Sequence, residues 1–127
     1  MRRRKVIPNP PLQPLRIPSG WTVDFNDFYE VEPTFKTYDD SAWNFKEDML
    51  QIKHERFRLL VDLGWYPTAR STGGFGLRLL HFLGEDKGAD WENPIEFVQT
   101  RSKRKVVKVI EDWLHHDWSS RAKPKKR

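Results

Sequence analysis

The residue pair that most suggests metal chemistry is His115-His116, near the end of a predicted helix. Adjacent residues on a helix point about 100° apart, so the two imidazoles cannot easily share one ion. The chain has no Cys and no pair of His at the spacing of a zinc-binding helix, so we expect no metal site. A structural role explains the pair better, because His near a helix C-terminus interacts favourably with the helix dipole.

A second set of residues, Glu47, His54, Asp62 and His81, has the side-chain types of acid–base catalysis. Their spacing does not require them to meet, and the apolar run around His81 favours a hydrogen-bonded core histidine. Residues 71–74 (STGG) have the glycines of a phosphate-binding loop but lack its Lys and its following helix. Nucleophile-elbow, dinucleotide and kinase motifs are absent as well. We therefore predict a protein that is not an enzyme and needs no cofactor.

Asp62 stands within an apolar run that extends from Leu59 to Leu63. The period-two pattern of a strand places Asp62 and Leu60 on one face and Val61 on the other. We expect the face with Asp62 to be exposed. The alternative is a buried carboxylate, which would need hydrogen bonds to offset its desolvation.

Charge is distributed unevenly along the chain. Residues 17–100 contain fifteen Asp and Glu against eight Lys and Arg, although the whole chain has a net charge of +5. The excess of basic residues lies in residues 1–16 and in residues 101–127. An acidic body suits a partner with a basic surface, whereas basic ends suit nucleic acid or an acidic membrane.

Five basic residues near the start of the last predicted helix could contact phosphate groups: Arg101, Lys103, Arg104, Lys105 and Lys108. Cations at this end oppose the helix dipole, which hints at a use other than stability. Aromatic residues are not interleaved with them as in a base-stacking surface, so we favour a solvated basic face. Nucleic-acid binding through this helix and the basic ends is the alternative function.

Apolar periodicity predicts a sheet followed by one helix. Strands are expected at residues 21–25, 58–66, 75–83 and 95–99, with a short extended piece at 28–31. Residues 45–53 fit either a strand or a helix, residues 53–55 suggest a turn, and residues 33–42 suggest a loop.

The last element is an amphipathic helix of about four turns, with Ser102 as its N-cap. Its apolar residues follow at three- and four-residue spacing: Val106, Val109, Ile110 and Trp113. Strands followed by one helix predict an α+β fold, in which the helix packs on one face of a mainly antiparallel sheet of four to five strands. We expect Trp21, Trp65 and Trp113 to be core residues.

The chain is long enough for one domain with extra segments at both ends. Five Pro in the first 18 residues predict a basic extended arm over residues 1–16, followed by one domain over 17–118. Residues 119–127 are basic and have few apolar residues, so we expect a disordered tail. Without Cys, a signal sequence or an apolar span, the chain is expected to be cytoplasmic and not bound to membranes.

Three strings of the sequence resemble a group of small bacterial immunity proteins: residues 17–23 (IPSGWTV), 45–51 (FKEDMLQ) and 61–67 (VDLGWYP). Residues 91–94 (WENP) extend this resemblance, which covers residues 15 to 115. Immunity proteins of polymorphic-toxin and contact-dependent growth inhibition systems are small, cytosolic and non-enzymatic. The resemblance implies that this chain inhibits a toxin domain by binding it.

The acidic body agrees with this role, because nuclease toxins are commonly basic. We predict that the partner is a toxin domain and that acidic side chains steer the chain onto its basic surface. The expected contact residues are Asp39, Asp40, Glu47, Asp48, Arg70, Gly73 and Gly74. The sequence leaves the oligomeric state open.

Overall fold

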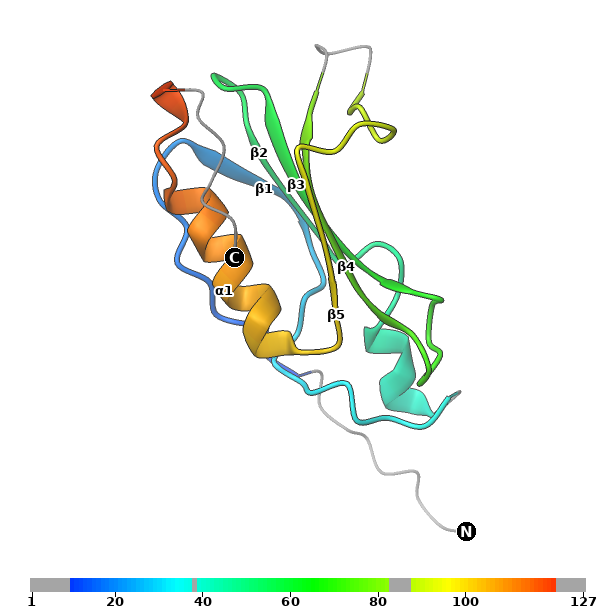
Figure 1. Ribbon diagram of the computed structural model, residues 1–127. Coiled ribbons are helices and arrows are strands. Elements are labelled where there is room, and N and C mark those ends of the chain that lie inside the picture. Colours follow the sequence, from blue (N-terminus) through cyan, green and yellow to red (C-terminus); the bar gives the residue numbers. More distant parts are fainter. Residues whose placement is uncertain (1–9, 38, 83–87, 121–127) are drawn as a thin grey trace, which may run out of the picture.

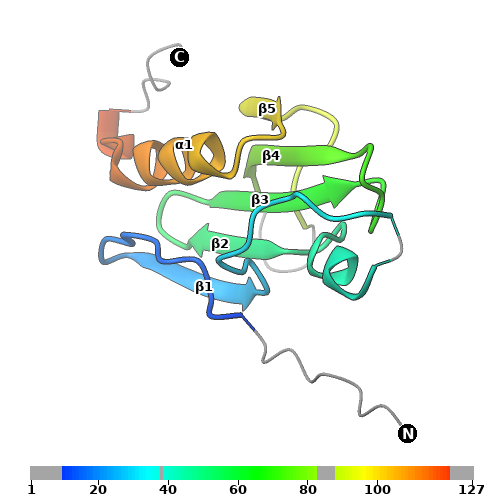
Figure 2. The ribbon, with the colours of Figure 1, turned by 90° about the horizontal axis from the view of Figure 1, so that it is seen from below.

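The computed structural model describes residues 10–37, 39–82 and 88–120, which form a sheet, an α-helix and two short 3₁₀ helices (Figure 1). The strands are β1 (Trp21–Asn26), β2 (Leu50–His54), β3 (Leu59–Tyr66), β4 (Gly74–His81) and β5 (Glu96–Thr100). The helices are η1 (Asp40–Asn44), α1 (Lys103–His115) and η2 (Trp118–Ser120). All neighbouring strands pair antiparallel in chain order, so the sheet is a five-stranded meander (Figure 2). This arrangement confirms the predicted α+β fold.

Strands β3 and β4 form the centre of the sheet, and their register sorts side chains onto two faces. Leu63 pairs with Leu77, and both are fully buried on the face against which α1 packs. The next pair along, Gly64 with Gly76, belongs to the opposite face. We call the first the helix-covered face and the second the helix-free face.

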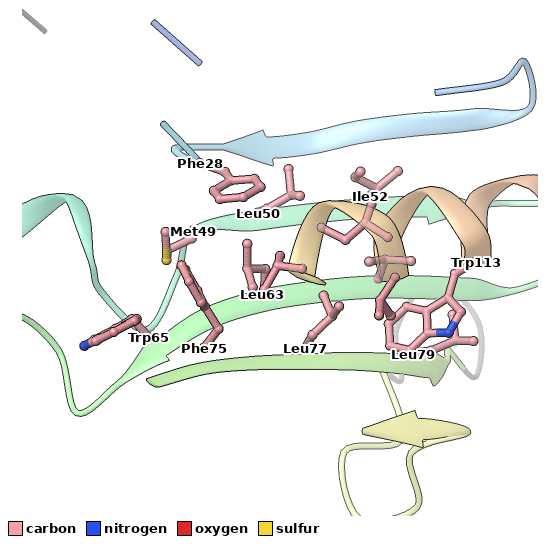
Figure 3. Close-up of a cluster of buried hydrophobic side chains, with 14 of the residues drawn as sticks. Phe28, Met49, Leu50, Ile52, Leu63, Trp65, Phe75, Leu77, Leu79 and Trp113 are labelled. Carbon is pink, nitrogen blue, oxygen red and sulfur yellow. The ribbon is translucent and has the colours of Figure 1, made fainter. Parts of the chain in front are cut away.

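The helix-covered face holds the main hydrophobic core (Figure 3). Ser102 caps α1 as predicted, because its side chain accepts a hydrogen bond from the backbone N–H of Lys105 at 3.1 Å. The apolar side of α1 then packs against the sheet through Val106, Val109, Ile110, Trp113 and Leu114. Trp65 and Trp113 are fully buried as predicted, whereas Trp21 is only partly buried.

The described residues of the segment 28–45, which are 28–37 and 39–45, cover the other end of this face with aromatic side chains. Phe35 stacks on Phe45 with 4.7 Å between ring centroids, and Phe45 lies edge-on to Trp65 at 5.2 Å. Trp65 in turn contacts Phe75 at 5.0 Å. This segment and α1 therefore cover the same face of the sheet, and the segment places η1 at the end of the sheet.

Four local predictions are resolved or corrected by the structure. The ambiguous stretch 45–53 forms a strand from Leu50 onward, within β2, and the predicted loop at 33–42 contains the start of η1. The turn expected at 53–55 lies at 55–58 instead, because Lys53 and His54 pair with β3. His81 is exposed and not a core residue, since it is the last residue of β4.

The described part of the Pro-rich arm contacts the domain. Leu12 forms an isolated bridge with Tyr29, and the N–H of Gln13 donates to the carbonyl of Phe28 at 2.7 Å. Arg16 donates to the carboxylate of Glu111 on α1 through its backbone N–H and its guanidinium. Hydrogen bonds therefore cross the boundary predicted after residue 16. Gln13 and Arg16 are not prolines, so each has a backbone N–H that donates to the domain. Residues 1–9 and 121–127 of the predicted arm and tail lie outside the described residues.

Two Trp indoles satisfy carbonyls at the C-terminal end of α1. Trp21 Nε1–H donates to the carbonyl of Leu114 at 3.0 Å, and Trp118 Nε1–H donates to that of Trp113 at 2.8 Å. The last carbonyls of a helix lack partners within the helix, so these bonds fix its end against β1 and η2. Within the described ranges, no helix is long and apolar enough to cross a membrane.

Candidate functional site

The 3₁₀ helix η1 presents a large aromatic side chain to solvent. Ala42 is fully buried and its N–H donates to the carbonyl of Asp39 at 2.9 Å, which fixes the turn. With Ala42 facing inward, Trp43 points outward and 57% of its surface is exposed. Asp39 and Asp40 are exposed beside it. An anchored turn thus carries an exposed indole close in sequence to two exposed carboxylates.

Two more carboxylates follow where the chain enters β2. The N–H of Trp65 donates to the carbonyl of Lys46 at 2.8 Å, and the N–H of Met49 donates to that of Leu63 at 3.0 Å. Between these anchors, Glu47 and Asp48 are exposed. We call the exposed Asp39, Asp40, Trp43, Glu47 and Asp48 the acidic end.

The loop between β3 and β4 packs beside this segment (Figure 1). The N–H of Ala69 donates to the carbonyl of Phe45 at 2.7 Å, and the hydroxyls of Thr37 and Ser71 lie 2.7 Å apart. The structure therefore brings the predicted loop contacts to the same end of the sheet as the predicted acidic contacts. Arg70 is exposed and Gly74 half-buried, whereas Gly73 is buried and a Cβ there would collide with the indole of Trp65.

Asp62 lies on the helix-free face as predicted, but only 2% of its surface is exposed. Gln51 on β2 donates its side-chain N–H to Asp62 Oδ1 at 3.1 Å, and Arg78 is the cross-strand neighbour on β4. Burial raises the pKa of Asp62, against the opposing effects of the Gln51 hydrogen bond and the Arg78 charge. Its expected exposure was wrong because side chains of the two flanking strands cover it.

The four residues of the candidate acid–base set do not come together. His54 lies on the helix-covered face, where its Nδ1 accepts from the N–H of Phe57 at 3.2 Å, whereas Asp62 faces the other side. Burial lowers the pKa of His54, and the charge of Arg56 adds to this effect. Across the described part of the chain, no group of three or more His, Asp and Glu could hold a metal ion.

The five basic residues at the start of α1 and just before it divide into two groups. Arg101 donates to the carbonyls of Ser71 and Gly73, and Lys103 donates to Gln13 at 2.7 Å, so both have structural roles. The remaining three, Arg104, Lys105 and Lys108, are exposed along the solvent side of the helix. Lys108 pairs with Asp112 one turn later, at 3.4 Å.

Sequence reasoning missed Trp43, although its surroundings held an indication. It is a lone large aromatic residue in the polar stretch 39–44 (DDSAWN), where no period-two or helical pattern assigns it to a core.

Comparisons with protein-family models, with curated proteins and with solved structures found no match to this chain.

Proposed function

We propose that this protein is a non-enzymatic binding module that acts as an immunity protein and neutralises a bacterial toxin domain in the cytoplasm. One observation carries the proposal: Trp43 is 57% exposed on an anchored turn, with exposed carboxylates beside it. Trp is enriched among the residues that dominate the energy of protein interfaces. Carboxylates around such an anchor favour a partner with a basic surface and speed its association.

The anchoring of the acidic end supports binding without large rearrangement. Ala42 and Phe45 are buried on either side of Trp43, and the β3–β4 loop is hydrogen-bonded to the same segment. A surface that is already ordered loses less conformational entropy when a partner binds. The resemblance of three sequence strings to immunity proteins narrows the basic partner to a toxin domain.

The test is co-expression with toxin domains encoded beside the gene for this chain. An immunity protein restores growth of cells that express its cognate toxin and elutes with that toxin domain as one complex in gel filtration. Unchanged toxicity of every neighbouring toxin, together with separate elution, would sink the proposal.

Two exposed tryptophans make a matched pair for locating the interface. Trp43→Ala removes the proposed anchor, and we expect the affinity for the toxin domain to fall by about thirtyfold or more, as for an interface hot spot. Trp91→Ala removes an indole that is 48% exposed far along the chain, and it serves as the control. Equal affinities of the two variants would place the interface elsewhere.

The alternative is a nucleic-acid-binding accessory protein, and the exposure of Arg104 and Lys105 at the start of α1 is the observation that favours it. Replacing both by Gln separates the two functions. A nucleic-acid binder would lose affinity and show a shallower dependence of affinity on salt. A toxin binder that uses the acidic end would keep its affinity for the toxin.

A further inference from the structure

A groove of about 530 Å³ lies between β3, β4 and β5 on the helix-free face. Its principal lining residues are Tyr66, Gly74, Gly76, Arg78, Phe97 and Arg101. Gly74 and Gly76 alternate on β4 with the buried Phe75. A Cβ at Gly76 would lie 3.2 Å from the ring of Tyr66, so that ring covers Gly76 and the open floor of the groove is the backbone at Gly74. We call this hollow the glycine groove.

Two arginines flank this floor. Arg78 lies between two aromatic rings, with its guanidinium carbon 4.4 Å from the ring centroid of Phe97 and 5.4 Å from that of Tyr66. Arg101 is held on the other side, because it donates to the carbonyls of Ser71 and Gly73. A guanidinium has five N–H donors, so Arg101 keeps donors beyond its two carbonyl bonds, and Arg78 keeps donors beyond its hydrogen bond with Tyr66.

Among the described residues, no Asp or Glu lines the groove. Asp62 is the cross-strand neighbour of Arg78, but it is buried, and burial raises the pKa of its carboxyl. The rings of Tyr66 and Phe97 are each partly exposed and supply flat apolar walls. The groove therefore combines guanidinium donors with aromatic surface.

We propose that the glycine groove binds an oxyanion, either phosphate or carboxylate, that is carried on a flat apolar group. The two guanidiniums hold the oxyanion by charge-assisted hydrogen bonds. The flat group lies over Gly74, where a Cβ would meet its nearest atoms only at 3.7 Å, and contacts the rings of Tyr66 and Phe97. A free aryl phosphate or aryl carboxylate has both features.

This site does not depend on the proposed toxin-binding role. The hydroxyl of Tyr66 donates to the carbonyl of Glu47 at 3.4 Å, so the groove adjoins the acidic end while having the opposite charge. Ligand binding can be measured on the isolated chain, with no toxin present. Failure of one proposal therefore leaves the other standing.

The experiment is titration of the ¹⁵N-labelled full chain with three ligands: inorganic phosphate, phenyl phosphate and benzoate. Glycine amides resonate in a separate region of the nitrogen spectrum, so Gly74 and Gly76 report directly on the groove. We expect saturable shifts of these two amides, with phenyl phosphate binding more tightly than inorganic phosphate. The stronger of phenyl phosphate and benzoate identifies phosphate or carboxylate as the preferred oxyanion.

Three charge variants provide the controls. Arg78→Gln and Arg101→Gln should each weaken phenyl phosphate binding by about tenfold or more, the loss expected for a charge-assisted hydrogen bond. Arg104→Gln removes an equal charge from the solvent side of α1 and should leave the affinity unchanged. Unshifted amides of the core residues Ile52 and Ile110 show that each variant is folded.

The proposal is overturned if the shifts do not saturate, if they spread over all basic surfaces, or if all three variants bind alike. It is also overturned if inorganic phosphate binds as tightly as phenyl phosphate, because the flat walls would then contribute nothing.

Discussion

The two faces of the same sheet differ in what they carry. On β3, Val61, Leu63 and Trp65 are fully buried under α1 and residues 28–45. The alternate residues of the same strand include a carboxylate, a glycine and the exposed ring of Tyr66. On β4 the contrast repeats, with Leu77 buried beside Gly76 and Arg78.

This difference separates folding from recognition. Period-two alternation places the apolar side chains of the central strands on the helix-covered face. There they form a contiguous core, which provides most of the hydrophobic stabilisation. The helix-free face is left with side chains that a core would exclude, together with the glycine groove. It is not uniformly open, because Leu60 and Leu80 are buried there. Substitutions on the two faces should therefore have different consequences.

The largest effect is expected on the helix-covered face. Trp113 is the largest side chain that α1 buries, and Trp113→Ala should lower the free energy of unfolding by about 3–5 kcal/mol. Urea melts of the variant and the parent chain measure this loss. A loss under about 1 kcal/mol would show that α1 does not dock on the sheet as described.

The next effect tests whether the helix-free face tolerates change. A Cβ at Gly64 would collide with the backbone carbonyl of Glu47 and lie 2.9 Å from the ring of Tyr66. We expect Gly64→Ala to cost about 1–3 kcal/mol, the usual range for overpacking.

Gly74→Ala is the control on the same face. A Cβ at Gly74 would meet its nearest atoms at 3.7 Å, an ordinary contact distance. The control should therefore leave the urea midpoint close to that of the parent chain. Equal losses from the two substitutions would mean that loss of glycine itself, and not the collision, sets the cost.

The sequence predicted the parts of the fold that follow from local periodicity. The strands around Leu63 and Leu77 and the helix after Ser102 were found from alternation, helical spacing and a capping residue. The burial of Asp62 was not, because it depends on Gln51 and Arg78 from two other strands. The topology of the sheet decides which strands flank β3. The alternation of residues within one strand cannot predict those neighbours.

The site was predicted less well than the fold. Charge counting found the acidic residues, and the structure places Asp39, Asp40 and Arg70 at one end of the sheet. Charge counting did not find Trp43, since the exposure of a lone aromatic residue depends on which neighbouring residue in the turn faces the core. Here Ala42 does so. The glycine groove likewise requires the register that places Gly76 beside Gly64.

The third prediction concerns the buried carboxylate of the helix-free face. Because burial raises the pKa of Asp62 in the folded chain, its contribution to stability is fully present below the unfolded pKa near 4 and is lost as the pH rises through the folded pKa. Asp62→Asn keeps an acceptor for Gln51 and removes the charge. The variant should be more stable than the parent chain at pH 7, and the gap should shrink on acidification.

Urea melts between pH 3.5 and 7 measure this gap, with Glu92→Gln as a control for removing an exposed carboxylate. Lower stability of Asp62→Asn at pH 7 would contradict the prediction. It would mean that attraction to Arg78 outweighs desolvation at this site.

The smallest effect concerns the Pro-rich arm, which contacts α1 through Arg16. Arg16 is 84% exposed and pairs with Glu111 at 3.1 Å, so Arg16→Ala should cost only about 0.2–1 kcal/mol, the range for solvent-exposed pairs. Burial raises the pKa of Glu111, but the hydrogen bonds from Arg16 outweigh it and the pKa is lowered. The pair therefore stabilises the fold above the unfolded pKa of Glu111, near 4.3, and loses this effect as the pH falls.

Hydrogen exchange at the amide of Gln13, which is bonded to Phe28, should be faster in Arg16→Ala at pH 7. Lys108→Ala breaks a comparable exposed pair within α1 and should leave that amide unchanged. Equal exchange of Gln13 in both variants would show that the arm is held by its bridge to Tyr29 and not by the ion pair.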